Sequence, residues 1–376
     1  MHTLFVREHN RLADEIAAAN PTFTDEEIFC EARLWLSAII QSVTYNEFLP
    51  AVLGPDAIPE YSGYDSSVVA NVVNEFSAAA FRVGHTMLPP VLLRLDESLE
   101  EIPEGHIDLA AAFFVPSVVS SIGIEPYLRG LAENPQQATD NLVVDGVRNF
   151  LFGQPGSGGF DLATLNIQRG REHGIDSYNA VRLALGLSEK TTFAKITADE
   201  DLQDRLSTAY DDTINDIDLW IGGLAEDNVE DSILGETFFT FWVDQFVRLR
   251  DGDPHYYLNQ DSDSNRTPFS DEEIAIIEGT TLADVIERNT SIVFDRESVF
   301  TLTPPCVQEF AFDPSNKEAS MSWTSYLNAG YEIWASDDLE TPFELIEEEI
   351  GEDEVTTLTF TDNGATDKRF YYVIQK

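Results

Sequence analysis

Apolar side chains recur at three- and four-residue spacing from residue 3 to about residue 290, with Pro and Gly between the runs. This periodicity is typical of amphipathic helices and predicts a mainly α domain. Thr24 and Glu27 form a capping box that opens the clearest helix, which continues to about Val43, and Ser270 with Glu273 forms another. Further helices are predicted near residues 66–85, 140–152, 162–173, 177–186, 199–210 and 234–250.

The pattern changes after Pro304-Pro305, where short alternating segments begin. Asp and Gly separate these segments, notably at Asp362-Asn363-Gly364, which is typical of strands joined by turns. The predicted strands lie at 321–323, 331–334, 343–346, 357–360 and 370–373. We therefore predict a helical domain over residues 1–303, followed by a small antiparallel β-sandwich-like module over residues 304–376.

The balance of charge is strongly acidic. The chain has 376 residues, of which 43% are hydrophobic, and 22 Lys and Arg face 68 Asp and Glu, for a formal net charge of -46. Such a charge repels nucleic acid and anionic membranes, so neither is expected as a partner. Self-repulsion of this size is best tolerated where salt screens it, which favours a saline, secreted setting, either extracellular or periplasmic. The acidic stretch 337–354 is interpreted as a solvated loop and strand face, because it lacks the spaced Asp residues of a calcium loop.

Cysteine and terminal signals are sparse. Cys30 and Cys306 are the only two cysteines, so we expect no disulfide framework and no bond between them. No apolar run reaches 18 residues, and no basic segment with an apolar core opens the chain, so neither a membrane span nor a signal peptide is visible. Helical periodicity begins at once after Met1 without a cap, which suggests that sequence upstream is missing.

Two segments could carry chemistry. In the first, Arg82, Gly84 and His85 follow an apolar run, and Arg82 precedes His85 by about one turn. A neutral imidazole can bind haem iron, a guanidinium can pair with a propionate, and glycine leaves room for a flat group. The alternative is a histidine that is hydrogen-bonded within the core.

The second segment places Asn166 and Arg169 one turn apart. An iron-bound histidine needs an acceptor for its other ring N–H, and an asparagine carbonyl can serve. Arg169 could hold a propionate, or the helix could merely carry surface ion pairs. The chain lacks the His-Glu-x-x-His, Walker, Gly-x-Ser-x-Gly and Cys-x-x-Cys motifs, which removes the usual support for zinc protease, nucleotidase, hydrolase and zinc-ribbon functions.

Segments 4–13 (LFVREHNRLA), 44–50 (TYNEFLP), 81–85 (FRVGH) and 165–174 (LNIQRGREHG) resemble, in order, segments of the animal-type haem peroxidases, the family of peroxidasin and myeloperoxidase. Residues 220–224, 246–253 and 286–290 extend the similarity to about four fifths of the chain. The resemblance implies the helical peroxidase fold and a haem b cofactor. It implies His85 as the proximal iron ligand, Asn166 as its hydrogen-bond partner, and Arg82 and Arg169 as propionate contacts.

In this family the distal histidine and arginine, the calcium loop and the carboxylates that can esterify haem lie upstream of the LFVREHN segment, with which this sequence begins. The resemblance therefore implies a carboxy-terminal part of the catalytic domain, without catalytic residues of the distal side and without the calcium site. We expect this chain to bind haem weakly or not at all by itself, and an upstream peroxidase segment to be its partner in turnover.

The resemblance implies an oxidoreductase that reduces hydrogen peroxide and oxidises halide or small organic donors, with the activity of this chain alone left open. A haem fatty-acid oxygenase is a second enzymatic alternative, although no tyrosine is singled out as a radical site. A non-catalytic extracellular interaction or adhesion protein with a degenerate peroxidase domain is a third. No catalytic role is assigned to the other histidines, His2, His9, His106, His173 and His255.

Overall fold

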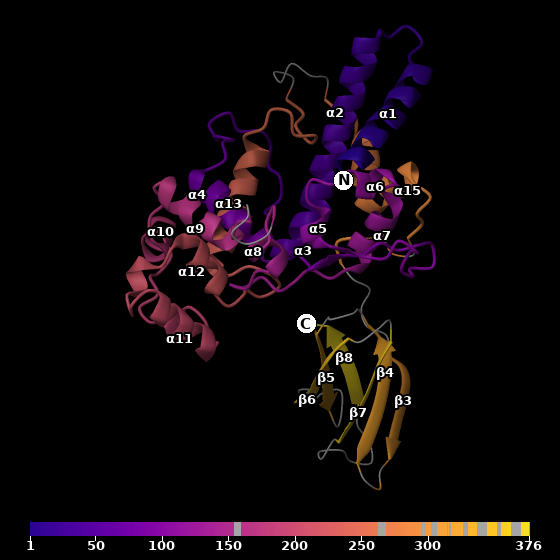
Figure 1. Ribbon diagram of the computed structural model, residues 1–376. Helices are drawn as coiled ribbons and strands as arrows, with labels where there is room; N and C mark the ends of the chain where they lie inside the picture. The colour runs from indigo at the N-terminus through magenta and orange to yellow at the C-terminus, as the bar shows by residue number, and fades with distance from the viewer. Residues whose placement is uncertain are drawn as a thin grey trace. The chain divides into compact units, whose positions relative to one another are not determined.

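The computed structural model describes residues 1–153, 159–261, 268–294, 296, 298–301, 307–313, 315, 317–325, 330–336, 344–351, 355–361 and 370–375. These residues divide into two compact units, one of residues 1–128 and 136–300 and the other of residues 129–135 and 301–376. The first unit is mainly helical and the second carries the two three-stranded β-sheets, so the predicted mainly α fold with a β module is confirmed (Figure 1). The boundary predicted at residues 303 and 304 lies outside the described residues.

The helical elements are α1 (His2–Ala19), α2 (Asp25–Val43), the π-helix η1 (Thr44–Phe48), α3 (Leu49–Leu53), α4 (Asn74–Ala78), the 3₁₀ turn η2 (Ala80–His85), α5 (Leu109–Ala112), α6 (Ser117–Ser120), α7 (Glu125–Glu133), α8 (Asp145–Arg148), α9 (Leu162–Glu172), α10 (Tyr178–Ala184), η3 (Phe193–Lys195), α11 (Glu200–Ala209), η4 (Ile214–Asp216), α12 (Leu219–Ala225), α13 (Glu236–Asp251), α14 (Asp271–Glu278) and α15 (Leu282–Asn289). Strands β1 (Val91–Leu92) and β2 (Ile107–Asp108) form a short antiparallel pair. No helix in the described part of the chain is both long and apolar enough to cross a membrane.

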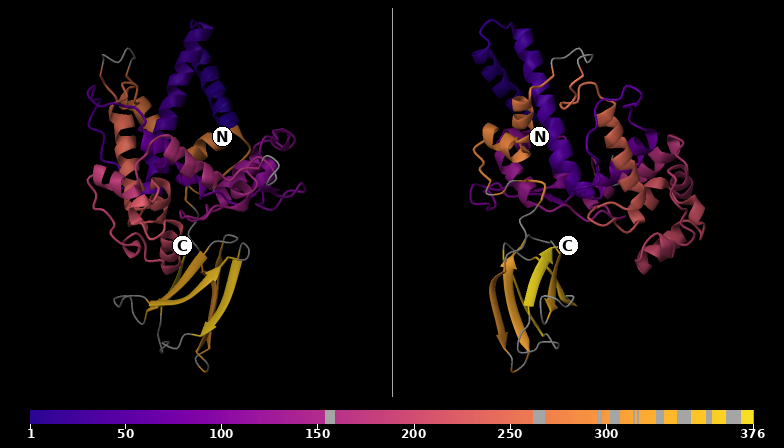
Figure 2. Two further views of the ribbon diagram at one scale, coloured as in Figure 1. Left: turned by 60° about the vertical axis from the view of Figure 1, so that its left-hand side comes forward. Right: turned by 180° about the vertical axis from the view of Figure 1, so that it is seen from behind.

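Helices α1 and α2 form an antiparallel hairpin (Figures 1 and 2). The predicted capping box opens α2, because Thr24 Oγ1 accepts from the Glu27 N–H at 3.3 Å and the Thr24 N–H donates to Glu27 Oε2 at 2.7 Å. The inner faces of both helices pack with α15 around fully buried Leu4 and Val285. Burial of these apolar side chains holds the hairpin against the carboxy-terminal helix of the unit.

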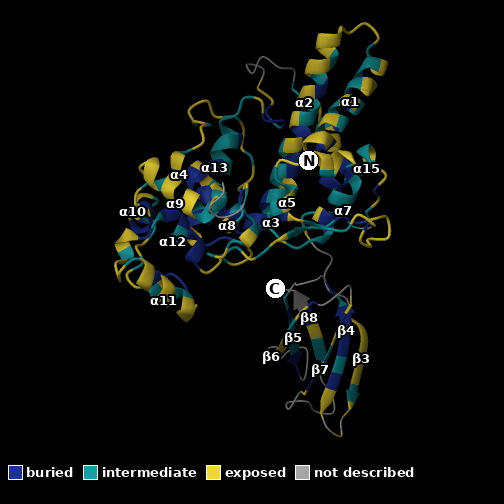
Figure 3. Cartoon of the chain, viewed as in Figure 1, coloured by how far each residue is buried: buried dark blue, intermediate teal, exposed yellow. Residues whose placement is uncertain are grey.

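The main core lies among α3, α10, α12 and α13. Tyr178, Ile217, Trp220, Phe238 and Trp242 are buried there at 5% exposure or less. Figure 3 shows the same distribution, with α12 almost entirely buried while one side of α1 and of α2 is exposed. This core therefore fixes the helices that surround residues 82–85 and 166–169, the two segments that could carry chemistry.

The helix predicted at residues 66–85 is wrong in its first half. Residues 67–73 contain four β-branched valines and have no helical structure, and the Gln245 side chain of α13 bonds two of their backbone groups. It accepts from the Val73 N–H at 2.9 Å and donates to the Asn71 carbonyl at 3.0 Å. Within residues 66–85 the backbone is helical only from α4 onward. The helix predicted at 140–152 is likewise shorter than expected, because only α8 forms there.

The β module contains two three-stranded antiparallel sheets, in the orders β3 (Val307–Asp313), β4 (Glu318–Thr324), β7 (Val355–Thr361) and β6 (Glu344–Ile350), β5 (Gly330–Ser336), β8 (Phe370–Gln375). Trp323, Tyr331 and Ile333 are fully buried between them, which is the arrangement of a small sandwich. Each of the five predicted strands falls on one of β4 to β8, and β3 was not predicted. The turn predicted at 362–364 and Cys306 lie outside the described residues, whereas Cys30 is free and exposed.

Candidate functional site

His85 ends the 3₁₀ turn η2, which two tryptophans hold in place. Trp242 Nε1 donates to the Ala80 carbonyl at 3.0 Å, and Trp220 Nε1 donates to the Arg82 carbonyl at 3.4 Å. Both indoles are buried in the main core, where an N–H group must find an acceptor. The two bonds therefore anchor the turn that carries Arg82 and His85 to α12 and α13.

Helix α9 brings Asn166 to His85. Asp161 caps this helix by accepting from the N–H groups of Ala163 and Thr164 at 2.9 and 3.2 Å. Asn166 is fully buried one turn into the helix, and its Nδ2 lies 2.8 Å from Nδ1 of His85. Two segments that lie 81 residues apart in the chain thus meet through these two side chains.

Arg82 completes this cluster from the same turn as His85. Its Nη1 donates to Asn166 Oδ1 at 3.1 Å, and its Nε donates to the Ser77 carbonyl at 3.1 Å. The asparagine amide therefore has its oxygen toward Arg82 and its nitrogen toward His85. The sequence had led us to expect the carbonyl at His85. The difference has a physical reason, because the guanidinium can only donate and so draws the amide oxygen to itself.

The electrostatics of the cluster favour a neutral imidazole. Burial lowers the pKa of His85, and the positive charge of Arg82 lowers it further. Burial and the nearby charge of Arg169 also lower the pKa of Arg82. A neutral imidazole retains a nitrogen lone pair, which is the form of histidine that binds metals.

Arg169 gives the site an uncompensated positive charge. Arg169 is exposed, and its guanidinium has neither a hydrogen bond nor an ion pair with any residue that the structure describes, although this protein carries 68 acidic residues. The charge of Arg169 acts on Arg82, whose side-chain hydrogen bonds go to the neutral oxygens of Ser77 and Asn166. Two guanidinium groups that gather without a carboxylate create a place for an anion from outside the chain.

Open space adjoins the cluster. A Cβ added to Gly84 or to Gly170 would meet no atom within 4 Å. Phe81 and Leu165, on the turn and on α9, are 50% and 40% exposed. An imidazole, two cations and apolar side chains at the rim suit a flat, largely apolar group with anionic arms, and haem has this chemistry.

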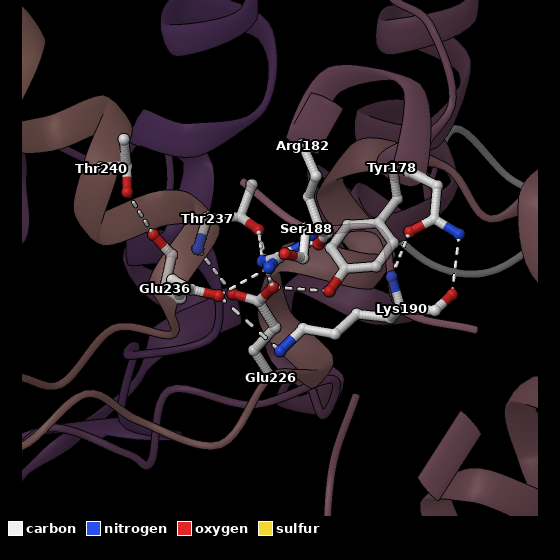
Figure 4. A network of polar contacts seen from close by, with 9 residues as sticks. Tyr178, Arg182, Ser188, Lys190, Glu226, Glu236, Thr237 and Thr240 are labelled. Atoms are coloured by element: carbon white, nitrogen blue, oxygen red, sulfur yellow. Dashed lines mark hydrogen bonds and ion pairs between the residues drawn. The ribbon is translucent and has the colours of Figure 1, made fainter. Parts of the chain in front are cut away.

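A buried ion-pair network sets the position of α12 (Figure 4). Arg182 of α10 donates to Glu226 Oε1 at 2.5 Å and to Glu236 Oε2 at 2.6 Å, and the Tyr178 hydroxyl also donates to Glu226 Oε1. Both oxygens of Glu226 are used, because Oε2 accepts the N–H of Thr237 at 2.6 Å. The network joins α10, the end of α12 and the start of α13, and through Trp220 it supports the turn of His85.

Sequence reasoning missed this network and the two tryptophans. Arg182 and Glu226 lie 44 residues apart, and neither sits in a pattern that suggests burial. Trp220 lies in residues 220–224, which the sequence analysis used only for their similarity to the haem peroxidases. An apolar residue close to the paired Gly222 and Gly223 could have indicated close packing of this segment. A Cβ at Gly223 would lie 2.3 Å from a Phe238 ring carbon.

The other histidines lie in different settings. His173 Nδ1 is 2.9 Å from Asn74 Oδ1, the His106 ring accepts the Arg94 N–H at 3.2 Å, and His9 packs against Phe29. Within the described part of the chain, no group of three His, Cys, Asp or Glu side chains could hold a metal ion. A metal at His85 would therefore need ligands from another group, as the iron of a haem has.

Comparison with known proteins agrees with this chemistry. A sequence model of the animal haem peroxidase family matches residues 1–300. Peroxinectin A of Dictyostelium discoideum is 41% identical over 294 residues, which are 77% of this chain and 52% of that protein. Human eosinophil peroxidase is 37% identical over 311 residues, which are 80% of this chain and 42% of that protein.

Solved structures share the fold. Peroxidase A of Dictyostelium discoideum superposes with a TM-score of 0.72 at 39% identity, over 79% of this chain and 55% of that one. A fatty acid alpha-dioxygenase of Oryza sativa superposes with a TM-score of 0.65 at 22% identity, over 79% of this chain and 56% of that one, which shows the fold alone. The chain spans about half the length of the relatives it matches. The match over residues 1–300 and these identities show that the chain belongs to the animal haem peroxidase family.

Proposed function

We propose that this chain forms the proximal part of a haem-dependent peroxidase that reduces hydrogen peroxide at the expense of a halide or a small organic donor. The observation that carries the proposal is the meeting of His85, Asn166 and Arg82 beside the unpaired Arg169. Membership of the animal haem peroxidase family supports it. The fatty-acid dioxygenases share only the fold at 22% identity, so they do not favour an oxygenase function.

Four residues would hold haem b. His85 offers an imidazole nitrogen to the iron, Asn166 hydrogen-bonds the other ring nitrogen, and Arg82 and Arg169 offer guanidinium groups to the propionates. When bound, the haem would supply the iron centre at which hydrogen peroxide is reduced. No calcium site and no distal base is proposed for this chain, and an extracellular or periplasmic location stays a prediction.

The chain's own residues set the proton on His85. With Asn166 Nδ2 at Nδ1, the ring proton lies on Nε2, whereas binding of iron through Nε2 needs that proton on Nδ1. Rotation of the asparagine amide by half a turn would bring its oxygen to Nδ1. It would also turn the amide nitrogen toward Arg82 Nη1, which is itself a donor. Loading of the site therefore requires Arg82 to release Asn166, which frees this guanidinium for an anion.

A haem titration tests the site. Ferric haem is added to the purified 376-residue chain and to a His85→Ala variant, and the Soret band is followed. We expect weak but saturable binding in the wild type that is lost in the variant. Equal saturable binding by both proteins would overturn the assignment of His85, whereas no binding by either would mean that the site needs an upstream peroxidase segment to hold haem.

The arginines are tested with haem dimethyl ester, whose propionates carry no charge. Arg169→Gln should weaken the binding of haem about tenfold, the effect of one charge-assisted contact, and should leave the binding of the ester nearly unchanged. Arg171→Gln, two residues along the same helix, serves as the control, since Arg171 is paired with Asp218 at 2.7 Å. An equal loss with both ligands would argue against a propionate contact.

A further inference from the structure

A cavity of about 520 Å³ lies away from the cluster of His85, in the helical unit. It is formed by residues of η1, by Pro50 of α3, by residues of the segment 54–61 and of the end of α13 with the following turn, and by Glu278 of α14. None of Arg82, His85, Asn166 and Arg169 lines it. Its volume falls within the range of small-molecule sites in proteins.

Four tyrosines form the wall of this cavity: Tyr45, Tyr61, Tyr256 and Tyr257. Their rings are neighbours, with centroids 4.9 Å apart for Tyr61 and Tyr256, 5.5 Å for Tyr45 and Tyr256, and 4.8 Å for Tyr256 and Tyr257. Burial raises the pKa of Tyr45, Tyr256 and Tyr257, so these rings are neutral phenols. Neutral phenol rings keep the negative faces of their π systems, which attract a cation.

Hydrogen bonds hold two of these rings in place. The Tyr45 hydroxyl donates to the Phe246 carbonyl at 2.7 Å. The Tyr257 hydroxyl donates to Glu278 Oε1 at 3.2 Å, and its backbone N–H donates to Gln41 Oε1 at 3.0 Å. The aromatic wall is therefore fixed before any ligand arrives, which lowers the entropy that binding would cost.

The same rings already contact one cation. The guanidinium carbon of Arg250 lies 5.9 Å from the centroid of Tyr45 and 5.5 Å from that of Tyr61, within the range of a cation–π contact. Arg250 is 4% exposed, and Asp251 neutralises it through an ion pair of 2.7 Å. Arg250 thus shows that these rings accept a positive charge. Because Asp251 neutralises Arg250, the net charge of the cavity is set by its other lining residues.

Those residues are acidic. Asp56, Glu60 and Glu278 line the cavity, and all three are exposed. None of them pairs with a Lys, Arg or His among the residues described here. Arg250, neutralised by Asp251, is the only basic residue among the described residues of the lining, so these residues combine aromatic rings with an unbalanced negative charge.

We propose that this cavity binds a small organic cation that carries an alkylated ammonium group. Such a cation has a diffuse charge and an apolar surface, so tyrosine faces and nearby carboxylates recognise it better than they recognise a hydrated metal ion. The site is independent of the haem cluster, and its occupation requires no haem. It is a binding site and carries no chemical step.

The test compares choline with its neutral analogue 3,3-dimethylbutan-1-ol, which has the same shape without the charge. Binding of each to the full 376-residue chain is measured by saturation-transfer difference NMR at a fixed ionic strength. We expect choline to bind at least about tenfold more tightly than the alcohol. Equal affinities would overturn the proposal, because shape alone would then explain the binding.

Variants separate the cavity from general attraction of cations to an acidic protein. Tyr61→Leu should weaken choline binding about tenfold, while Tyr61→Phe, which keeps the ring, should bind as the wild type does. Glu278→Gln should weaken binding, and Glu272→Gln on the same helix but outside the cavity should not. Circular dichroism melts confirm that each variant is folded. If all four variants bind choline equally, the cation is condensed on the surface and the proposal fails.

Discussion

Asn166 Nδ2 lies 2.8 Å from His85 Nδ1, while Oδ1 of the same amide accepts a hydrogen bond from Arg82 at 3.1 Å. A fully buried amide thus has one end on an imidazole and the other on a guanidinium. The oxygen of an amide accepts hydrogen bonds and its nitrogen donates them. By holding the oxygen of Asn166, Arg82 therefore selects the tautomer of the His85 ring. Arg82 therefore controls His85 through both its charge and this amide.

The charge of Arg82 should be visible in the titration of His85. Arg82→Gln removes the nearby positive charge, so the pKa of His85 should rise. Two-dimensional NMR of the imidazole resonances across pH measures this directly. Arg205→Gln, an exposed site on α11, is the control and should leave His85 unchanged. A pKa of His85 that stays fixed in Arg82→Gln would show that Arg82 acts only through the amide.

The lowered pKa of His85 also predicts how stability depends on pH. The folded state resists protonation of this ring, whereas the unfolded chain binds the proton near pH 6.5, the ordinary value. The unfolding free energy contributed by neutral His85 is therefore fully present above pH 6.5 and is lost as pH falls through the folded pKa. Urea denaturation of wild type and His85→Gln from pH 8 to pH 5 isolates this contribution. A difference between the two proteins that is constant with pH would contradict the assignment.

Local patterns in the sequence predicted the elements that depend on local contacts. The capping boxes at Thr24 and Ser270 open α2 and α14 as expected, because each is completed within three residues. Helix α9 also follows its pattern, and the spacing of Asn166 and Arg169 places them one turn apart. Such elements are predictable because their stabilising contacts lie within one turn of the chain.

Long-range contacts decided the rest. Gln245 satisfies the backbone near Val73 from 172 residues away, and this bond replaces the first half of a predicted helix by an irregular segment. The orientation of the Asn166 amide depends on Arg82, 84 residues earlier. No window of sequence contains either pair, so the residues of the cluster could be named, but the hydrogen bonds between them could not.

The buried pair of Arg182 and Glu226 should dominate the stability of the helical unit. Glu226→Gln removes the 2.5 Å carboxylate partner of the buried guanidinium, which keeps Glu236 at 2.6 Å, and should cost about 1.5–3 kcal/mol of unfolding free energy. Urea denaturation of the variant and the wild type measures the loss. Arg205→Met, at an exposed arginine of α11, should change stability by less than about 0.5 kcal/mol. A loss below about 1 kcal/mol in Glu226→Gln would mean that water or another residue replaces the carboxylate.

The glycines of α9 and α12 give a matched pair of substitutions. A Cβ at Gly223 would lie 2.3 Å from a Phe238 ring carbon in the main core, so Gly223→Ala should destabilise the protein by about 1–3 kcal/mol. Gly170 lies inside α9 with no atom within 4 Å of such a Cβ, so Gly170→Ala should stabilise by up to about 1 kcal/mol. Thermal unfolding of both variants shows whether the two substitutions change the stability in opposite directions. The same sign for both would contradict the packing argument.

The net charge of -46 predicts a dependence of stability on salt. Negative side chains cluster even within single elements, as in β6 with Glu347, Glu348 and Glu349, and they repel one another across the surface. The screening length shortens from about 10 Å at 0.1 M salt to about 3 Å at 1 M, so added NaCl removes most of this repulsion. The unfolding temperature should therefore rise steeply between about 0.05 and 0.5 M NaCl and then level off, as the screening length falls below the spacing of the charges. Sucrose at equal osmolality controls for exclusion from the surface, which stabilises without screening. An unfolding temperature that is independent of NaCl, or that responds equally to sucrose, would show that the acidic surface does not strain the fold.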